Sequence, residues 1–370
     1  NQSTAVWEMS PVGTVIETQV VRWLCELAGL PATSGGTLTT GGTEASFTAL
    51  LAARNAAIPD AWSRGVGANP PVIVYGEHAH YAVTRAAGEL GLGMDAAVSV
   101  PSRELRMDPR ILRETLDALA ANGRRVMAVV ATAGTTATGS FDDLEAIGAL
   151  CDERAIWLHV DAAHGGSALF SETHRAKVAG LHRARTIAWD PHKMMLLPLS
   201  AGVLLLRDER DAERAFAQRA PYLFHGGEGR IVDQGVRSFQ CSRRADAIKV
   251  WVALQRYGAR GIGALYDALC ARAAELHALL EAHPAFTPLH APESNILCFR
   301  WTGAGSEDDA SLDEANRALR ERYNRSGEGW ITTTVLAGRR VLRVTIMNPR
   351  TGSAELRRLV DGLSAMARPL

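Results

Sequence analysis

Short apolar runs alternate with helical patterns along the middle of the chain, and this alternation constrains the fold more than any other feature. Strands are expected at residues 72–75, 96–100, 126–131, 156–160, 186–189 and 202–206. Helices are expected between them, at residues 81–90, 112–121 and 144–153. Continuous apolar strands separated by helices are typical of a mostly parallel sheet that is covered on both faces. The sequence therefore predicts an α/β fold.

Different patterns flank this region. On its N-terminal side, helices are expected at residues 14–30 and 44–57, separated by a glycine-threonine stretch at residues 35–43. On its C-terminal side, helices are expected at residues 262–283, 312–323 and 354–366, and strands at residues 295–301 and 340–347. This second pattern indicates a smaller α+β domain. We therefore expect a large domain at residues 1–257 and a small C-terminal domain at residues 258–370.

Composition and charge argue against several classes of function. Lysine plus arginine and aspartate plus glutamate each number 40, so no charge excess favours a nucleic acid or a membrane as partner. The five cysteines include no Cys-x-x-Cys pair, which argues against a disulfide framework or a zinc site. No signal peptide is visible, and no apolar run approaches the roughly 18 residues that a membrane span needs. We expect a cytoplasmic protein without a bound metal.

Lys193 is the first candidate for chemistry. It lies in the segment Asp-Pro-His-Lys-Met-Met, directly after the expected strand 186–189, which Pro191 ends. A lysine in such a loop can be an ordinary solvated charge. The residues that follow it are apolar, however. A lysine in a partly buried, apolar loop has a lowered pKa and becomes a nucleophile that can form a Schiff base.

Asp161 is the second candidate, in the segment His-Val-Asp-Ala-Ala at the carboxyl end of an apolar strand. Ligands of parallel sheets usually bind at that end, and a buried acid needs a partner. One interpretation is a helix cap or a salt bridge to an arginine. The other is a carboxylate that pairs with the protonated pyridine nitrogen of a cofactor. The small residues after Asp161 would then leave room for a flat ring.

Three weaker signals precede these two residues in the chain. Residues 40–43, Thr-Gly-Gly-Thr, open a helix whose free N–H groups could bind a phosphate, although Thr43 could simply be an N-cap. His80 begins a helix after a strand, where it could also be a structural or capping residue. Thr136 belongs to a run of small hydroxyl residues after the strand 126–131, which forms either a turn or polar contacts to a ligand.

Taken together, these five segments resemble the group II amino-acid decarboxylases that depend on pyridoxal 5'-phosphate (PLP). This family includes glutamate, cysteine sulfinate, 2,4-diaminobutyrate and aromatic amino-acid decarboxylases. The resemblance runs from near Ala5 to the C-terminus, and its most specific part is the pairing of His-Val-Asp-Ala-Ala with Asp-Pro-His-Lys. It implies the type I PLP-dependent transferase fold, with a seven-stranded sheet in the large domain, and a homodimer.

The resemblance also implies a role for each matching residue. Lys193 would bind PLP as a Schiff base, and Asp161 would pair with the pyridine nitrogen. Ala163 would pack against one face of the ring, and His80 would stack on the other face and help to orient the bond that breaks. Thr136 would contact the cofactor or the substrate carboxylate.

The phosphate contacts follow the family pattern except at one position. Gly42, Thr43 and His192 would hold the phosphate, with Asp190 beside them. The family often has asparagine where this chain has Asp190. An acid beside a phosphate is electrostatically unfavourable, so this contact departs from what the resemblance implies.

Two further departures concern whole segments. Family members carry an additional N-terminal segment that wraps the dimer and supplies part of the substrate pocket. We expect this segment to be missing from the protein, either because it was removed or because the interface is built differently. The family's mobile loop usually carries a tyrosine that protonates the carbanion, whereas residues 224–241 contain none. His225 could be the general acid instead. Alternatively, the loop only covers the site, or the carbanion is diverted to oxidative deamination that gives an aldehyde.

The expected substrate is a small acidic or polar amino acid, because several segments are closer to the glutamate and cysteine sulfinate branch than to the aromatic one. Arg343 matches an arginine that this branch uses for a substrate carboxylate, and its planar guanidinium suits that group. It could instead be a structural arginine. Decarboxylation is the leading hypothesis. Its alternatives are a PLP enzyme of the same fold that carries out oxidative deamination, and a non-catalytic relative that keeps the fold for binding or assembly.

Overall fold

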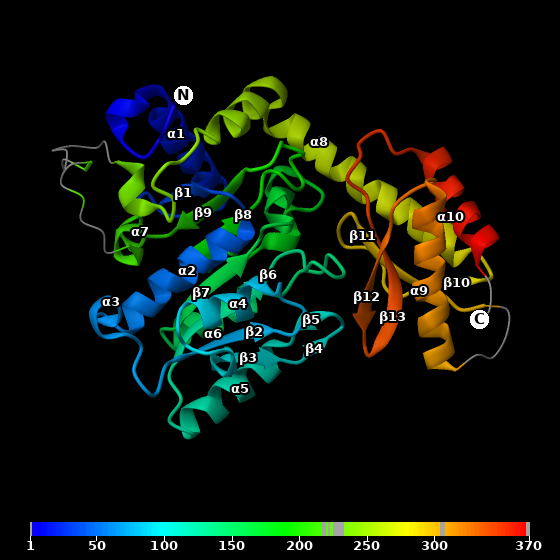
Figure 1. Ribbon diagram of the computed structural model, residues 1–370, viewed down its shortest axis with the longest axis horizontal. Helices are drawn as coiled ribbons and strands as arrows, with labels where there is room; N and C mark the ends of the chain where they lie inside the picture. The colour runs from blue at the N-terminus through cyan, green and yellow to red at the C-terminus, as the bar shows by residue number, and fades with distance from the viewer. Residues whose placement is uncertain (1, 217–219, 221–222, 225–232, 304–307, 368–370) are drawn as a thin grey trace. The chain divides into compact units, whose positions relative to one another are not determined.

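The computed structural model describes residues 2–216, 220, 223–224, 233–303 and 308–367. The chain divides into two units (Figure 1). The first unit comprises Asn1–Thr135 and Phe141–Gly263, and the second comprises Thr136–Ser140 and Ala264–Leu370. Each unit is built on its own large sheet.

A seven-stranded sheet forms the centre of the first unit, in the order β1-β9-β8-β7-β6-β2-β3. Neighbouring strands from β3 to β8 are parallel, and β9 is antiparallel to both β8 and β1. The prediction of a mostly parallel sheet is therefore confirmed. The strands are β1 (Gly35–Thr39), β2 (Val72–Gly76), β3 (Ala97–Val100), β6 (Val126–Thr132), β7 (Trp157–Asp161), β8 (Thr186–Trp189) and β9 (Gly202–Leu206), and a separate hairpin consists of β4 (Ser102–Arg103) and β5 (Arg106–Met107).

Helices surround this sheet, and proline or aspartate marks the start of several of them. Asp108 caps α5 by accepting the Arg110 N–H, and Asp143 caps α6 by accepting the Ala146 N–H. Across the described ranges, no helix combines the length and the apolar character that a membrane crossing requires. The helices of this unit are α1 (Pro11–Leu27), α2 (Gly42–Ala57), α3 (Ala61–Arg64), α4 (Ala82–Glu89), α5 (Pro109–Ala121), α6 (Leu144–Glu153) and α7 (Arg210–Ala215), with short 3-10 helices at Trp7–Met9, Met94–Ala96, Gly165–Phe170, Arg175–Val178, Leu181–Arg183 and Gln234–Arg237.

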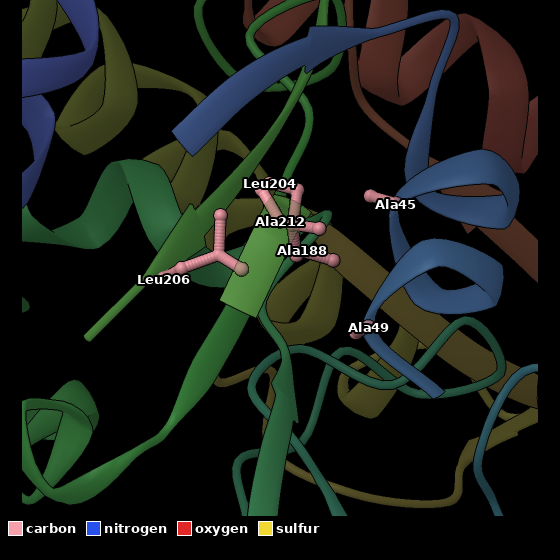
Figure 2. Close-up of a cluster of buried hydrophobic side chains, with 6 residues drawn as sticks. All are labelled: Ala45, Ala49, Ala188, Leu204, Leu206 and Ala212. Atoms are coloured by element: carbon pink, nitrogen blue, oxygen red, sulfur yellow. The ribbon is translucent and has the colours of Figure 1, made fainter. Parts of the chain in front are cut away.

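Small side chains allow α2 to pack closely on the sheet. The helix contacts β8, β9 and α7, and Figure 2 shows the buried cluster at this contact. Its members are alanines on the helices and on β8, together with leucines on β9. They are Ala45, Ala49, Ala188, Leu204, Leu206 and Ala212. Because alanine adds little bulk, the helix backbone lies near the strands and its N-terminus is held at the edge of the sheet.

A buried ion pair joins α1 to β1. Glu17 and Arg243 are 1% and 5% exposed, and Arg243 Nη2 lies 2.6 Å from Glu17 Oε1. The guanidinium also donates to the hydroxyls of Thr4 and Thr37 and to the carbonyl of Leu38. Glu17 Oε1 in turn accepts the Leu38 N–H over 3.0 Å. The pair thus satisfies backbone groups of β1 as well as its own charges.

The second unit contains a four-stranded antiparallel sheet in the order β10-β11-β13-β12. Helix α9 packs on β11 and β13, and α10 packs on α9. The predicted α+β character of this region is confirmed. The elements are β10 (Phe286–Pro288), β11 (Ile296–Trp301), α9 (Asp309–Ser326), β12 (Thr332–Leu336), β13 (Arg339–Thr345) and α10 (Ser353–Met366), and the long helix α8 (Ala247–Glu281) runs from the first unit into the second.

The glycine-threonine stretch contains a strand that its sequence does not suggest. β1 pairs with β9 from Gly35 opposite Leu206 to Thr39 opposite Gly202. A Cβ on Gly36 would lie 2.2 Å from the Leu204 carbonyl oxygen, so the close pairing itself requires a glycine. Pairing with β9 therefore stabilises the strand conformation despite the low strand propensity of glycine.

The predicted limit between the two domains falls at a break in α8. Gly258, with φ 63° and ψ 175°, interrupts the helical conformation there. The first compact unit, in contrast, extends to Gly263, and Thr136–Ser140 belongs to the second unit. The limits 1–257 and 258–370 stay a prediction about the folding domains.

Candidate active site

The carboxyl ends of β7 and β8 bring the first two candidate residues to one edge of the sheet. Asp161 is the last residue of β7, and Lys193 lies in the turn after β8. These strands are parallel, and Asp161 pairs with Ala188 of β8. The Asp161 side chain is buried, and its Oδ1 accepts the Ala163 N–H over 3.1 Å. The predicted strand-end positions of Asp161 and Lys193 are confirmed.

The amine of Lys193 faces a carboxylate. Its Nζ lies 3.1 Å from Asp190 Oδ2, and its backbone N–H donates to the Asp190 carbonyl over 2.9 Å. Met194 and Met195 are buried as predicted, but the Lys193 side chain is 37% exposed. The amine is therefore held by an ion pair and accessible from solvent. The buried apolar part of this loop therefore consists of Met194 and Met195, and it does not enclose the Lys193 amine.

Asp190 also faces His192, whose Nε2 lies 3.5 Å from Asp190 Oδ2. On the other side of the ring, His192 Nδ1 accepts the Ala201 N–H over 3.1 Å. In the neutral imidazole this contact assigns the ring proton to Nε2, on the side of Asp190. Burial lowers the pKa of His192, and the charge of Asp190 opposes this shift only in part. The contacts thus favour a neutral ring that can donate from Nε2.

Residues 41–43, called the glycine turn below, begin α2 beside residues 190–201, the loop between β8 and β9 that carries Lys193 and is called the lysine loop below. Among the described residues, no side chain caps the start of this helix, so its first N–H groups can bind an anion. A Cβ on Gly42 would lie 2.9 Å from the Ala163 Cβ and 3.1 Å from Asp190 Oδ2. The turn must therefore be glycine to approach Asp190 this closely. Thr43 lies inside the first helical turn, so its interpretation as an N-cap is wrong.

His80 lies between β2 and α4. Its Nδ1 accepts the Ala82 N–H over 3.2 Å, and its ring centroid is 4.1 Å from that of Tyr81. Burial lowers the pKa of His80, while the charge of Asp161 raises it and that of Lys193 lowers it further. His80 also follows the carboxyl end of β2, which runs parallel to β6, β7 and β8, so it lies at the same edge of the sheet as Asp161 and Lys193. The structure thus brings His80, Asp161 and Lys193 into one site.

The chain matches a known protein family over most of its length. A family model described as "Pyridoxal-dependent decarboxylase conserved domain" matches residues 1–302. The chain belongs to this family. It is a pyridoxal-dependent amino-acid decarboxylase, and the resemblance of its motifs to the group II enzymes is confirmed.

Individual relatives cover the whole chain. The L-2,4-diaminobutyrate decarboxylase of Rhizobium meliloti is 36% identical, over 100% of this chain and 73% of that protein. The cysteine sulfinic acid decarboxylase of Rattus norvegicus is 32% identical, over 100% of this chain and 78% of that protein. The crystal structure of mouse CSAD superposes with a TM-score of 0.93 at 31% identity, over 100% of this chain and 79% of that one. The predicted type I fold is confirmed by this similarity.

One residue that supports the strand end beside Asp161 has no counterpart among the sequence predictions. The buried carboxylate of Asp142 accepts the Met107 N–H over 2.8 Å and the Thr132 N–H over 2.7 Å. Thr132 is the last residue of β6 and pairs with Asp161. Asp142 therefore fixes the strand end next to Asp161. In the sequence it stands beside the N-cap Asp143, and nothing there distinguishes the two acids.

The structure does not test the predicted site roles of three further residues. Arg343 lies in the second unit, where its Nε donates to the carbonyls of Thr136 and Ala137 over 2.9 and 3.0 Å. These contacts support the structural alternative for Arg343 and use the backbone of Thr136. The substrate role of Arg343 and the cofactor role of Thr136 stay predictions. His225 lies outside the described residues.

His159 is buried beneath α2, two residues before Asp161 on β7. Its Nδ1 lies 3.0 Å from Thr186 Oγ1, and its Nε2 lies 3.3 Å from Ser46 Oγ. Ser46 belongs to α2 and Thr186 to β8, so the imidazole links the helix to the sheet. Burial lowers the pKa of His159 to about 4. The ring is therefore neutral in the folded enzyme at neutral pH.

We expect His159 to make the stability of the enzyme depend on pH between about 6.5 and about 4. Its pKa is 6.5 without the protein environment and about 4 in the folded state. Below pH 6.5 the unfolded chain binds a proton at His159 that the folded enzyme excludes. The contribution of His159 to the free energy of unfolding therefore has its full value above pH 6.5 and falls on acidification. The loss should reach about 2 kcal/mol by pH 5 and roughly 3 kcal/mol by pH 4.

Urea unfolding of the wild type and of His159→Gln, at pH 7 and at pH 5, measures this contribution. Glutamine can still bond to both hydroxyls, but it does not titrate. The variant should lose less stability between the two pH values than the wild type does. Equal losses in the two proteins would assign the pH dependence to other groups.

Proposed function

We propose that this decarboxylase removes the α-carboxylate of a small acidic or otherwise polar amino acid, with Lys193 as the residue that binds PLP covalently. Two relatives support the substrate class. The enzymes named for L-2,4-diaminobutyrate and for cysteine sulfinic acid are 36% and 32% identical to this chain. Both names denote small amino acids with an ionisable side chain.

The observation that carries the proposal is the arrangement of three binding groups at one edge of the sheet. The amine of Lys193 is accessible, the carboxylate of Asp161 ends the neighbouring strand, and the glycine turn presents an uncapped helix start among the described residues. These three features suit three groups of PLP: the amine suits its aldehyde, the carboxylate suits its pyridine nitrogen, and the helix start suits its phosphate. The residues present therefore fit this cofactor.

Each of these residues would act on a stated group. PLP, when bound, supplies an electron sink for the bond that breaks. The Nζ of Lys193 would bind its aldehyde carbon, and the carboxylate of Asp161 would hold a proton on its pyridine nitrogen. The N–H groups of Gly42 and Thr43 would bind its phosphate, and the ring of His80 would cover one face of the site. The other proposed contacts are Thr136, Ala163, Asp190 and His192, with Arg343 for a substrate carboxylate or sulfinate.

A product assay tests the reaction and its substrate. The enzyme is incubated with PLP and, separately, with glutamate, aspartate, cysteine sulfinate, 2,4-diaminobutyrate and an aromatic amino acid. We expect carbon dioxide and the matching amine in equal amounts, with faster turnover for a small polar amino acid than for the aromatic one. Aldehyde and peroxide without amine would contradict decarboxylation and support oxidative deamination. Faster turnover of the aromatic amino acid would contradict the substrate class.

We also propose that the enzyme is a homodimer, as the family resemblance implies. Light scattering of the purified enzyme measures its mass in solution. A mass of one chain, unchanged by PLP, would contradict the dimer.

A further inference from the structure

The two carboxylate oxygens of Asp190 lie in different surroundings. The side chain is 2% exposed, and its Oδ2 lies 3.1 Å from Lys193 Nζ and 3.5 Å from His192 Nε2. Its Oδ1 is buried and has no hydrogen-bond partner among the described residues. A buried carboxylate oxygen without a donor is unfavourable. Packing alone does not account for an acid at this position.

The same carboxylate lies next to the glycine turn. A Cβ on Gly42 would be 3.1 Å from Asp190 Oδ2, and one on Gly41 would be 3.9 Å from it. The turn begins a helix of 16 residues, and the positive end of the helix dipole favours an anion at this point. Asp190 therefore places a negative charge beside the group that would bind phosphate. Two anions this close to each other repel.

Asp190 is unsuited to bind phosphate directly. A carboxylate accepts hydrogen bonds but has no proton to donate when it is ionised. Donors near the glycine turn include its own N–H groups and Nε2 of His192, which would lie 3.8 Å from a Cβ on Gly41. Within the described part of the chain, the short contact of Asp190 to a lysine or arginine is its ion pair with Lys193.

We propose that Asp190 is the counter-ion of Lys193 and weakens phosphate binding at the glycine turn, so that it limits how tightly the enzyme holds its cofactor. This inference rests on the proposed function. The family often has asparagine at this position, which has the same shape without the charge. Lys193 neutralises part of the repulsion, and the remainder opposes the phosphate.

Titration of the cofactor-free enzyme with PLP tests this role of Asp190. The dissociation constant is measured from the quenching of tryptophan fluorescence. Asp190→Asn should bind PLP about tenfold more tightly than the wild type, because one repulsive charge is removed at short range. Asp190→Ala should also bind more tightly, although it offers no amide. Asp60→Asn is the matched control, because it removes an equal charge from an exposed acid of the same unit, and should bind PLP as the wild type does.

Inorganic phosphate tests the ion pair without any reaction at Lys193. Thermal unfolding of the cofactor-free proteins at increasing phosphate concentration gives the affinity of each protein for phosphate. Lys193→Ala should weaken phosphate binding, because Asp190 then lacks its counter-ion. Asp190→Asn should strengthen phosphate binding more in the Lys193→Ala background than in the wild type. Such coupling is the expected result for two residues that interact directly.

The outcomes separate this inference from the proposed function. Unchanged or weaker PLP binding by Asp190→Asn would overturn the inference, even if the wild type decarboxylates amino acids as proposed. Tighter binding by the asparagine variant but not by the alanine variant would also overturn it, because the added amide would then be the cause. Additive effects of the two substitutions on phosphate binding would exclude the ion pair. A wild type that binds no PLP would refute the proposed function, and the phosphate experiment would still test the inference.

Discussion

Lys193→Ala is expected to abolish covalent binding of PLP and to lower kcat by roughly 10⁴-fold or more, since the variant has no amine at the carboxyl end of β8. The cofactor would then be held only by noncovalent contacts. Its visible absorbance should shift toward that of free PLP. The expected loss is this large because the side chains that contact this loop, the carboxylate of Asp190 and the ring of His192, cannot form a Schiff base in place of the amine.

The composition of the chain makes this prediction easy to check. It contains three lysines, Lys177, Lys193 and Lys249. Reduction of the PLP-loaded enzyme with borohydride, followed by peptide mass mapping, should find the label on Lys193 alone. Lys177→Arg keeps a charge at its position and should retain the label and the activity. A label on Lys177 or Lys249 would show that the site has been assigned to the wrong lysine.

Arg243→Met should destabilise the enzyme by about 3 to 5 kcal/mol, because it leaves the carboxylate of Glu17 buried without a counter-charge. The substitution keeps most of the side-chain volume, so the effect comes from the charge and the lost hydrogen bonds. Arg243 donates to Thr4, Thr37 and Leu38 as well as to Glu17, and these acceptors lose their donor too. Urea unfolding at neutral pH measures the change.

Two further variants show whether burial of an unpaired charge causes the loss of stability in Arg243→Met. Arg113→Met breaks an ion pair with Glu153 whose side chains are 48% and 54% exposed, and it should cost less than about 1 kcal/mol. The double variant Glu17→Met, Arg243→Met removes both buried charges and should recover much of the lost stability. A double variant as unstable as Arg243→Met alone would show that the lost packing and hydrogen bonds, rather than the unpaired carboxylate, cause the effect.

The strands with strong local signals could be predicted from the sequence. β8 and β9 are fully buried and continuously apolar, and their observed bounds are the predicted ones. β1 could not be predicted in this way, since Gly35 and Gly36 form a strand only through their pairing with β9. β12 was also missed. It consists of three threonines, a valine and Leu336 at the edge of its sheet, and only Leu336 is buried, so the alternating buried face that makes a strand visible in a sequence is missing.

The features of the candidate site also divide into those with a local sequence signal and those that depend on tertiary contacts. Lys193 and Asp161 could be identified because each stands directly after an apolar strand, and parallel strands carry their ligands at that end. The contacts of these residues could not be identified. The ion pair of Lys193 with Asp190 and the exposure of its side chain depend on how the turn after β8 folds. The role of Asp142 depends on the backbone N–H groups of Met107 and Thr132, which lie 35 and 10 residues before it, and no residue pattern reveals these contacts.

The antiparallel pairing of β1 with β9 has a consequence for the order of folding. The glycine turn directly follows β1, and the lysine loop directly precedes β9. At the junction a Cβ on Gly202 would lie 2.5 Å from the Gly41 Cα, so the two backbones touch. The strands are far apart in the chain, and closing so long a loop is slow compared with forming local helices. We therefore expect a newly made chain to form helices before it completes the proposed cofactor site.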